Sequence, residues 1–138
     1  MRMLRLSAAL LLPITADVAT FSYAQAPTVP EPPALLTVTT SRIPKADTQD
    51  VRILPATLPP GAASTWHMHP SPPFAYVIEG TVVIESETRP PIEVKAGHAI
   101  AEPTGKVIRA VNRGTVPTKL VIFYVAPPRT PFLEEVRR

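Results

Sequence analysis

The sequence predicts an all-β domain, built as a sandwich, a jelly roll or a barrel. Three observations predict this class: short runs rich in β-branched and aromatic residues, glycines placed between those runs, and 19 prolines among 138 residues. Proline cannot donate to a helix or to a central sheet ladder, so this content favours short strands joined by rigid turns. With 45% apolar and 18% charged residues, the chain has the composition of one packed domain.

The predicted strands follow one another closely, with no room for helices between them. No stretch keeps a 3.6-residue apolar period, with the exception of the short segment 132–138. The nine runs that predict strands are residues 35–40, 51–58, 64–69, 74–79, 81–85, 92–95, 98–102, 107–112 and 118–125.

The N-terminal residues have the features of a secretory signal peptide. Arg2 and Arg5 precede a short apolar run, AALLLPITA, and small residues follow it. We expect cleavage after Ala24, so that residues 1–24 are a signal peptide and the mature protein is periplasmic or secreted, with no membrane attachment. The alternative is a disordered or barrel-packed N-terminus. Residues 25–33 form a proline-rich linker, and residues 34–138 form the β-domain.

Charge and cysteine content exclude several functions. The formal net charge is +3, but lysines and arginines do not cluster along the chain, so nucleic acid is not an expected partner. The chain has no cysteine, which excludes disulfides, thiolate metal sites, a cysteine nucleophile and a lipoprotein anchor. No Gly-x-Ser-x-Gly elbow and no glycine-rich phosphate loop is present.

Two segments carry a resemblance to a known family. Residues 61–80 read GAASTWHMHPSPPFAYVIEG, and residues 97–112 read GHAIAEPTGKVIRAVN. The first resembles the first cupin motif, through Gly61, His67-x-His69 and Gly80. The second resembles the second cupin motif, which continues from a glycine through Pro-x-Gly to an asparagine; the matching residues are Gly97, Pro103, Gly105 and Asn112. The resemblance implies a small single-domain cupin, with a double-stranded β-helix barrel related to the jelly roll, commonly a homodimer.

The sequence departs from the family pattern at two positions. The usual cupin metal site uses three histidines and one glutamate. In this chain Pro73 stands at the position of the glutamate and Ile108 at that of the third histidine. Neither side chain ligates a metal, so the resemblance carries over only His67 and His69 as ligands.

Glu102 is the candidate for a third ligand. Residues at i and i+2 of a strand share a face, so His67 and His69 point the same way, and Glu102 precedes the turn that the cupin layout places near them. Together they predict a two-histidine, one-carboxylate site for a divalent transition metal such as Fe, Mn, Ni, Cu or Zn. The alternative is a solvent-facing Glu102 beside two histidines that only line the pocket. Without a metal, the three groups predict a His–Glu pair with raised histidine pKa values.

The third histidine, His98, is expected to be a surface or structural residue. It begins the predicted strand that ends at Glu102, and four residues of strand span about 13 Å. In the cupin layout His98 therefore lies at the far end of the barrel. Trp66 alternates with the two ligand histidines and is expected to pack on the opposite face.

Three functional hypotheses follow. The first is a periplasmic or secreted metal-binding cupin that acts on a small organic molecule by oxygenase, isomerase or lyase chemistry, through Lewis-acid activation at the ion. The second is a non-catalytic barrel that binds a small ligand with a degenerate metal site, which the loss of two usual ligands favours. The third is a structural relic retained for assembly with a partner. The sequence leaves open whether the protein is an enzyme.

Overall fold

A computed structural model describes residues 28–137 of the chain. The predicted signal peptide, residues 1–24, lies outside the described residues, as do residues 25–27 of the predicted linker and residue 138. The described part of that linker, residues 28–33, is exposed and contains neither strand nor helix. The architecture below lies within one unit that begins at Pro33.

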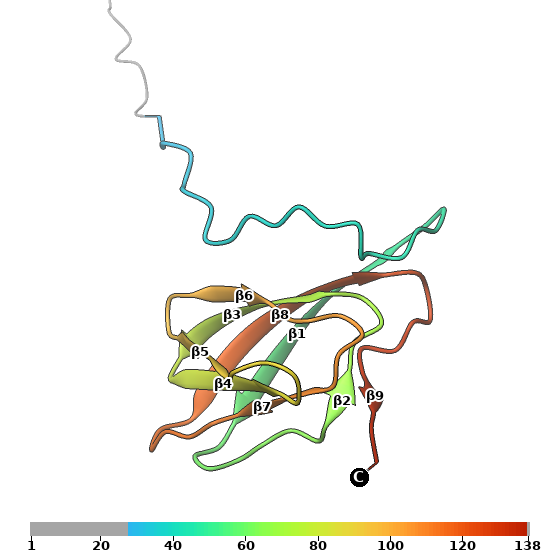
Figure 1. Ribbon diagram of the computed structural model, residues 1–138. Helices are drawn as coiled ribbons and strands as arrows, with labels where there is room; N and C mark the ends of the chain where they lie inside the picture. Colours follow the sequence, from blue (N-terminus) through green and yellow to red (C-terminus); the bar gives the residue numbers. More distant parts are fainter. Residues whose placement is uncertain (1–27, 138) are drawn as a thin grey trace, which may run out of the picture. The chain divides into compact units, whose positions relative to one another are not determined.

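The regular structure of residues 28–137 consists of strands alone, which confirms the all-β prediction (Figure 1). No helix in this range is long and apolar enough to cross a membrane. The strands are β1 (Asp50–Leu58), β2 (His67–Met68), β3 (Pro73–Glu79), β4 (Thr81–Ser86), β5 (Ile92–Lys95), β6 (Ala99–Ala101), β7 (Ile108–Val111), β8 (Thr118–Ala126) and β9 (Glu134–Glu135).

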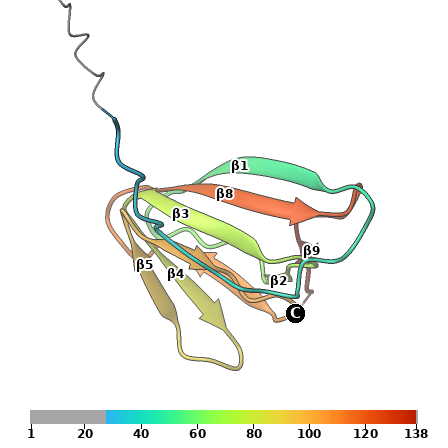
Figure 2. The same cartoon turned by 90° about the horizontal axis from the view of Figure 1, so that it is seen from above.

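The strands pair into two antiparallel sheets. Their orders are β1-β8-β3-β6, here the first sheet, and β5-β4-β7-β2-β9, here the second sheet. Apart from the β4–β5 hairpin, successive strands alternate between the two sheets. Figure 2 shows β1, β8 and β3 in one layer and β4 and β5 in the other. This interleaved pairing is the double-stranded β-helix arrangement, and it brings residues distant in the sequence together.

The burial pattern of β8 explains why a strand forms there. Every second residue from Thr118 to Ala126 is buried, and the residues between them are half-buried or exposed. β1 pairs with β8 in continuous register, from Asp50 opposite Ala126 to Leu58 opposite Thr118, and has the same two-residue period. Because side chains alternate between the faces of a strand, one side of each strand faces the interior.

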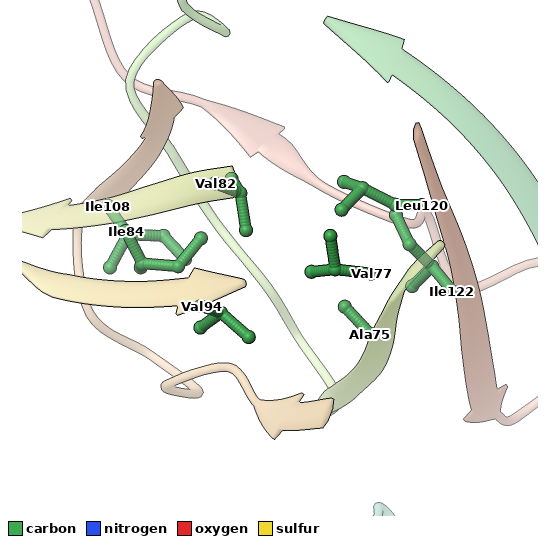
Figure 3. Close-up of a cluster of buried hydrophobic side chains, with 8 residues drawn as sticks. All are labelled: Ala75, Val77, Val82, Ile84, Val94, Ile108, Leu120 and Ile122. Atoms are coloured by element: carbon green, nitrogen blue, oxygen red, sulfur yellow. The ribbon is translucent and has the colours of Figure 1, made fainter. Parts of the chain in front are cut away.

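An apolar core fills part of the space between the sheets, as Figure 3 shows. Each sheet contributes four side chains to it. Those of the first sheet are Ala75, Val77, Leu120 and Ile122, and those of the second are Val82, Ile84, Val94 and Ile108. Full burial of a valine, leucine or isoleucine contributes about 1.5–3 kcal/mol relative to exposure. In a chain without cysteine, this packing and the sheet hydrogen bonds hold the barrel together.

Gly80, the single residue between β3 and β4, is required by its surroundings. Its φ is +75°, and a Cβ at this position would lie 2.7 Å from the backbone oxygen of Pro117. Only glycine avoids both the left-handed strain and this contact. The sharp turn lets the chain leave the first sheet and enter the second.

The structure corrects two expectations about secondary structure. Residues 35–40, predicted as a strand, are not one; Leu35, Leu36 and Val38 instead line a groove with Phe74 and Phe123 of the first sheet. These three side chains remain 66%, 38% and 42% exposed, so their apolar character does not reflect burial in a sheet. The segment 132–138, which had a helix-like period, contains the short strand β9, which pairs with β2.

Candidate metal centre

His67 lies in β2 with its ring directed into the barrel. The residue opposite it on β7 is Ile108, and the one opposite it on β9 is Glu135. The side chain is 5% exposed, and its Nδ1 lies 2.8 Å from the carbonyl oxygen of Thr65. A carbonyl only accepts hydrogen bonds, so Nδ1 carries the proton and Nε2 is the free nitrogen of a neutral ring.

His69 follows β2 and is almost fully buried, at 1% exposure. Its Nδ1 lies 2.7 Å from the carbonyl oxygen of Phe132, so this nitrogen also donates and Nε2 is directed at the other two side chains. The segment that carries Phe132 is itself held in place: Tyr124 donates to the oxygen of Pro131 at 2.8 Å, and Arg52 donates to the oxygen of Thr130 at 2.6 Å.

Glu102 follows β6 and points inward, at 8% exposure. Its backbone N–H donates to the oxygen of Pro73 at 2.9 Å, which fixes the chain at this point. Its carboxylate Oε2 lies 3.0 Å from Nε2 of His69. The structure thus brings together the three residues that the sequence selects, with one ligand atom of each within 4.8 Å of the others.

The three converging atoms are all electron-pair donors. Nε2 of His67 and Nε2 of His69 are 3.1 Å apart, although each ring already uses its proton at Nδ1. Two lone pairs and a carboxylate oxygen at these distances repel one another unless a cation or an additional proton lies between them. Neighbouring ligands about 2.1 Å from one ion and about 90° apart are themselves about 3 Å apart. The donor atoms and the two separations at His69 therefore fit a divalent metal ion, whereas the group as a whole, which spans up to 4.8 Å, would have to contract to about 4.2 Å or less around one ion.

Burial determines the protonation of His67. Desolvation lowers the pKa of His67 below its ordinary value, and this effect outweighs the hydrogen bond to Thr65 and the charge of Glu102, which raise it. The expectation of raised histidine pKa values in the absence of a metal is therefore wrong for His67. A neutral imidazole is the form that ligates a metal.

The two departures from the cupin motifs have distinct places in the structure. Ile108 is 1% exposed and stands opposite His67, where its apolar side chain borders the site. Pro73 is buried at the start of β3, and its carbonyl accepts the backbone N–H of Glu102. Pro73, which stands where the family has a glutamate ligand, thus helps to hold Glu102, a glutamate that follows β6.

A cavity of about 130 Å³ adjoins the three side chains. Its lining includes Ile84, Ile108, Ile122 and Phe132 as well as His67, His69 and Glu102. A largely apolar wall with a few converging polar groups is the usual form of a small-molecule site.

The remaining candidates lie outside the centre, as the sequence predicts. His98 is exposed in the turn between β5 and β6, with Nδ1 3.2 Å from the oxygen of Ala96. Trp66 is half-buried, and the guanidinium carbon of Arg109 lies 4.6 Å from its ring centroid. Neither residue belongs to the group that could hold a metal ion.

The groups that orient the histidines could not be predicted from the sequence. These are the backbone oxygens of Thr65 and Phe132, together with Tyr124 and Arg52, which hold the segment before Phe132. A backbone oxygen is present in every residue, so no residue type marks it. For Thr65 the position offers one indication, because the backbone oxygen two residues before a histidine is within reach of that histidine's Nδ1.

Known structures resemble this fold. An uncharacterized conserved protein with a double-stranded β-helix domain from Klebsiella pneumoniae matches with a TM-score of 0.54 and 21% identity, over 70% of this chain and 92% of that one. A polyketide cyclase of Streptomyces resistomycificus matches with a TM-score of 0.53 and 22% identity, over 64% of this chain and 61% of the cyclase. A DMSP lyase of Ruegeria pomeroyi matches with a TM-score of 0.51 and 17% identity, over 62% of this chain and 42% of the lyase. The chain therefore spans less than two thirds of the length of either enzyme.

The sequence itself also matches a family. No curated protein gives a significant match, but the profile of the cupin domain matches residues 56–124, half of the chain. This segment runs from β1 to β8 and includes His67, His69 and Glu102. Profile, topology and structural neighbours agree, and the chain belongs to the cupin domain family.

Proposed function

We propose that the protein is an exported cupin that holds a divalent transition metal through His67, His69 and Glu102 and acts on a small organic molecule. The observation that carries this proposal is the convergence of two Nε2 atoms and one carboxylate oxygen in a buried site. Such a set is unfavourable without a cation and suits one with it.

The residues of the chain have separate tasks in this proposal. Thr65 and Phe132 hold the imidazoles by their Nδ1–H groups, which keeps the Nε2 lone pairs directed at the centre. The apolar wall that includes Ile108 keeps water from part of the site and contacts the organic portion of a substrate. A bound divalent ion supplies Lewis-acid polarisation of a substrate oxygen and open coordination positions.

The reaction class we propose is an oxygenase, isomerase or lyase reaction on a small molecule. Two structural neighbours are a cyclase and a lyase by name, which supports enzymatic use of this barrel. The second candidate function is a non-catalytic metal-containing barrel that binds a small ligand. The presence of Pro73 and Ile108 at two of the family's ligand positions favours it, as does an inner cavity of only about 130 Å³.

Metal content tests the site directly. The protein is purified without chelator and without a histidine tag, and its metals are measured by mass spectrometry beside His67→Ala, Glu102→Ala and His98→Ala. We expect near-stoichiometric iron, manganese, nickel, copper or zinc in the wild type and in His98→Ala, and its loss in the other two variants. Absence of metal from the wild type, even after reloading, would refute the proposal and leave a ligand-binding barrel.

A second copy of this chain is the partner we propose for the outer face of the first sheet. The family resemblance predicts a homodimer, and exposed apolar side chains on this face support it, with Val51 68%, Ile53 62% and Phe123 44% exposed. Light scattering is expected to give twice the chain mass for the wild type and the monomer mass for Ile53→Glu. Val116→Glu, which alters an exposed valine in the β7–β8 connection, is the matched control. A monomeric wild type would refute the dimer.

Export is proposed from the sequence alone. The arginines and the apolar run before Ala24 support a cleaved signal peptide and a periplasmic or secreted protein. N-terminal sequencing of the protein from the periplasmic fraction is expected to begin at Gln25. A cytoplasmic protein that retains Met1 would refute this part of the proposal.

A further inference from the structure

A second pocket, of about 290 Å³, adjoins the candidate metal centre. Glu102 lines both this pocket and the inner cavity, so the two meet at one metal-ligand candidate. Three basic side chains also line it, each from a different segment. Arg42 precedes β1, Arg89 lies in the β4–β5 turn and Lys106 lies in the β6–β7 turn. The fold therefore gathers cations that are scattered in the sequence; we call this the cationic pocket.

The three cations are not neutralised by neighbouring acids. Within residues 28–137, no ion pair involves Arg42, Arg89 or Lys106. Other exposed basic residues, Lys95, Arg113 and Lys119, are each paired with a glutamate. Among the residues that the structure describes, Glu102 is the only acidic one that lines the cationic pocket. A concave surface with this excess of positive charge concentrates anions.

A hydroxyl in the same pocket lacks a hydrogen-bond partner. Thr104 lines the pocket, and its Oγ1 is buried without a partner among the protein atoms. A buried hydroxyl without a hydrogen bond costs about 1–3 kcal/mol. Because this oxygen has almost no accessible surface, a ligand oxygen could reach it only after the Thr104 side chain rotates. The three cations are exposed around one concave surface and by themselves favour an oxyanion.

We propose that the cationic pocket binds the oxyanion group, a carboxylate or a phosphate, of the small molecule on which the metal centre acts. This inference rests on the proposed function and names its substrate class: a small organic anion. The charged end lies among Arg42, Arg89 and Lys106, and the organic end reaches the apolar inner cavity past Glu102. The volume of the pocket is near the lower end for small-molecule sites.

The charge of Glu102 couples the pocket to the metal. In the metal-free protein its carboxylate repels an anion that approaches the cationic pocket. A divalent ion held by Glu102, His67 and His69 offsets that charge and adds its own attraction. Anion binding is therefore tighter in the metal-loaded protein than in the metal-free protein, while the three basic residues give both forms some affinity.

An NMR titration at an ionic strength of about 0.1 M, where the Debye length is about 10 Å, tests the proposal, with inorganic phosphate and with butyrate as separate probes. Each is added to the metal-free and to the zinc-loaded protein. In the variant Arg42→Ala/Arg89→Ala/Lys106→Ala we expect the dissociation constant to rise at least about tenfold. The control variant Lys95→Ala/Arg113→Ala/Lys119→Ala loses the same charge elsewhere, and its dissociation constant is expected to change less than about twofold, because distant exposed charges are screened.

The outcomes separate this inference from the proposed function. Tighter binding of phosphate identifies a phosphate-bearing ligand, and tighter binding of butyrate identifies a carboxylate. Absence of binding of both probes by the wild type, or equal weakening in the two triple variants, overturns the inference. If zinc does not bind but the probes still bind through the three basic residues, the result supports the anion pocket and refutes the metal centre.

Discussion

The barrel interior contains two regions that are equally buried but chemically opposite. Around Val77 and Val82 it is purely apolar, with exposed fractions of 0% and 1%. Around His67, His69 and Glu102 it is polar, with exposed fractions between 1% and 8%. Removal of apolar groups from water is favourable, whereas burial of a carboxylate among lone pairs is costly. Equal burial thus stabilises the fold in the first region and requires a cation or an additional proton in the second.

The largest effect we expect is that of the metal on the polar region. With a divalent ion at about a hundred times its dissociation constant, the free energy of unfolding rises by about 2.7 kcal/mol. For a domain of this size, this raises the melting temperature by about 10 °C. Calorimetry should show the rise in the wild type and in His98→Ala, its reversal by a chelator, and its absence in His69→Ala. A rise of equal size in His69→Ala would remove the distinction between the two regions.

The second-largest effect on the free energy of unfolding should come from truncation of a side chain in the apolar region. We expect Val77→Ala to lower the free energy of unfolding by about 2 kcal/mol, through lost burial and the cavity left behind. Urea denaturation measures this, with Val116→Ala, an exposed valine, as a control that changes stability by less than about 0.5 kcal/mol. The folded variant should keep the metal stoichiometry of the wild type. Loss of metal in Val77→Ala would mean that the two regions are not independent.

A substitution in the polar region should raise, rather than lower, the free energy of unfolding when no metal is present. We expect Glu102→Gln to raise the free energy of unfolding of the metal-free protein by about 1 kcal/mol. The substitution removes a buried charge, and the amide –NH2 donates a hydrogen bond to the free Nε2 of His69. Denaturation in the presence of a chelator measures it. A loss as large as that of Val77→Ala would contradict the account of the site as an unfavourable cluster without a cation.

The smallest effect concerns a charge on the barrel surface, which provides a third environment for comparison. Glu85 accepts from Arg109 at 2.7 Å and from Arg113 at 2.5 Å, and these hydrogen bonds lower the pKa of Glu85 below its ordinary value. A lowered pKa stabilises the folded state above the ordinary carboxyl pKa, and this stabilisation is lost as the pH falls through the folded value. Glu85→Gln should therefore cost less than about 1 kcal/mol at neutral pH.

The pH dependence checks this last prediction. The difference in melting temperature between wild type and Glu85→Gln should shrink as the pH is lowered below about 4.5. A difference that stays constant over that range would show that the carboxylate charge is not its cause.

Residue type and the placement of turn residues predicted most of the strands, and the resemblance to the cupin motifs predicted that Glu102 lies near the two histidines. Runs rich in β-branched and aromatic residues predicted β1 and β8, and the i, i+2 spacing of His67 and His69 predicted their shared face. The segment 35–40 was predicted wrongly because β-branched and apolar residue types do not distinguish a strand that pairs in a sheet from a segment that does not. The cationic pocket was not predicted, since Arg42, Arg89 and Lys106 are close only after folding.

The hydrogen bond from His69 to the oxygen of Phe132 has a consequence for the order of events during synthesis. It joins residues 63 positions apart, and β2 also pairs with β9, which follows Phe132. A nascent chain therefore carries both histidines long before it contains the segment that orients one of them. Until that segment has been synthesised, the imidazole of His69 can turn either nitrogen towards a passing ion. The site is therefore among the last parts of the domain to reach its final geometry, and an ion that arrived before residue 132 was synthesised would meet an imidazole that is not yet oriented.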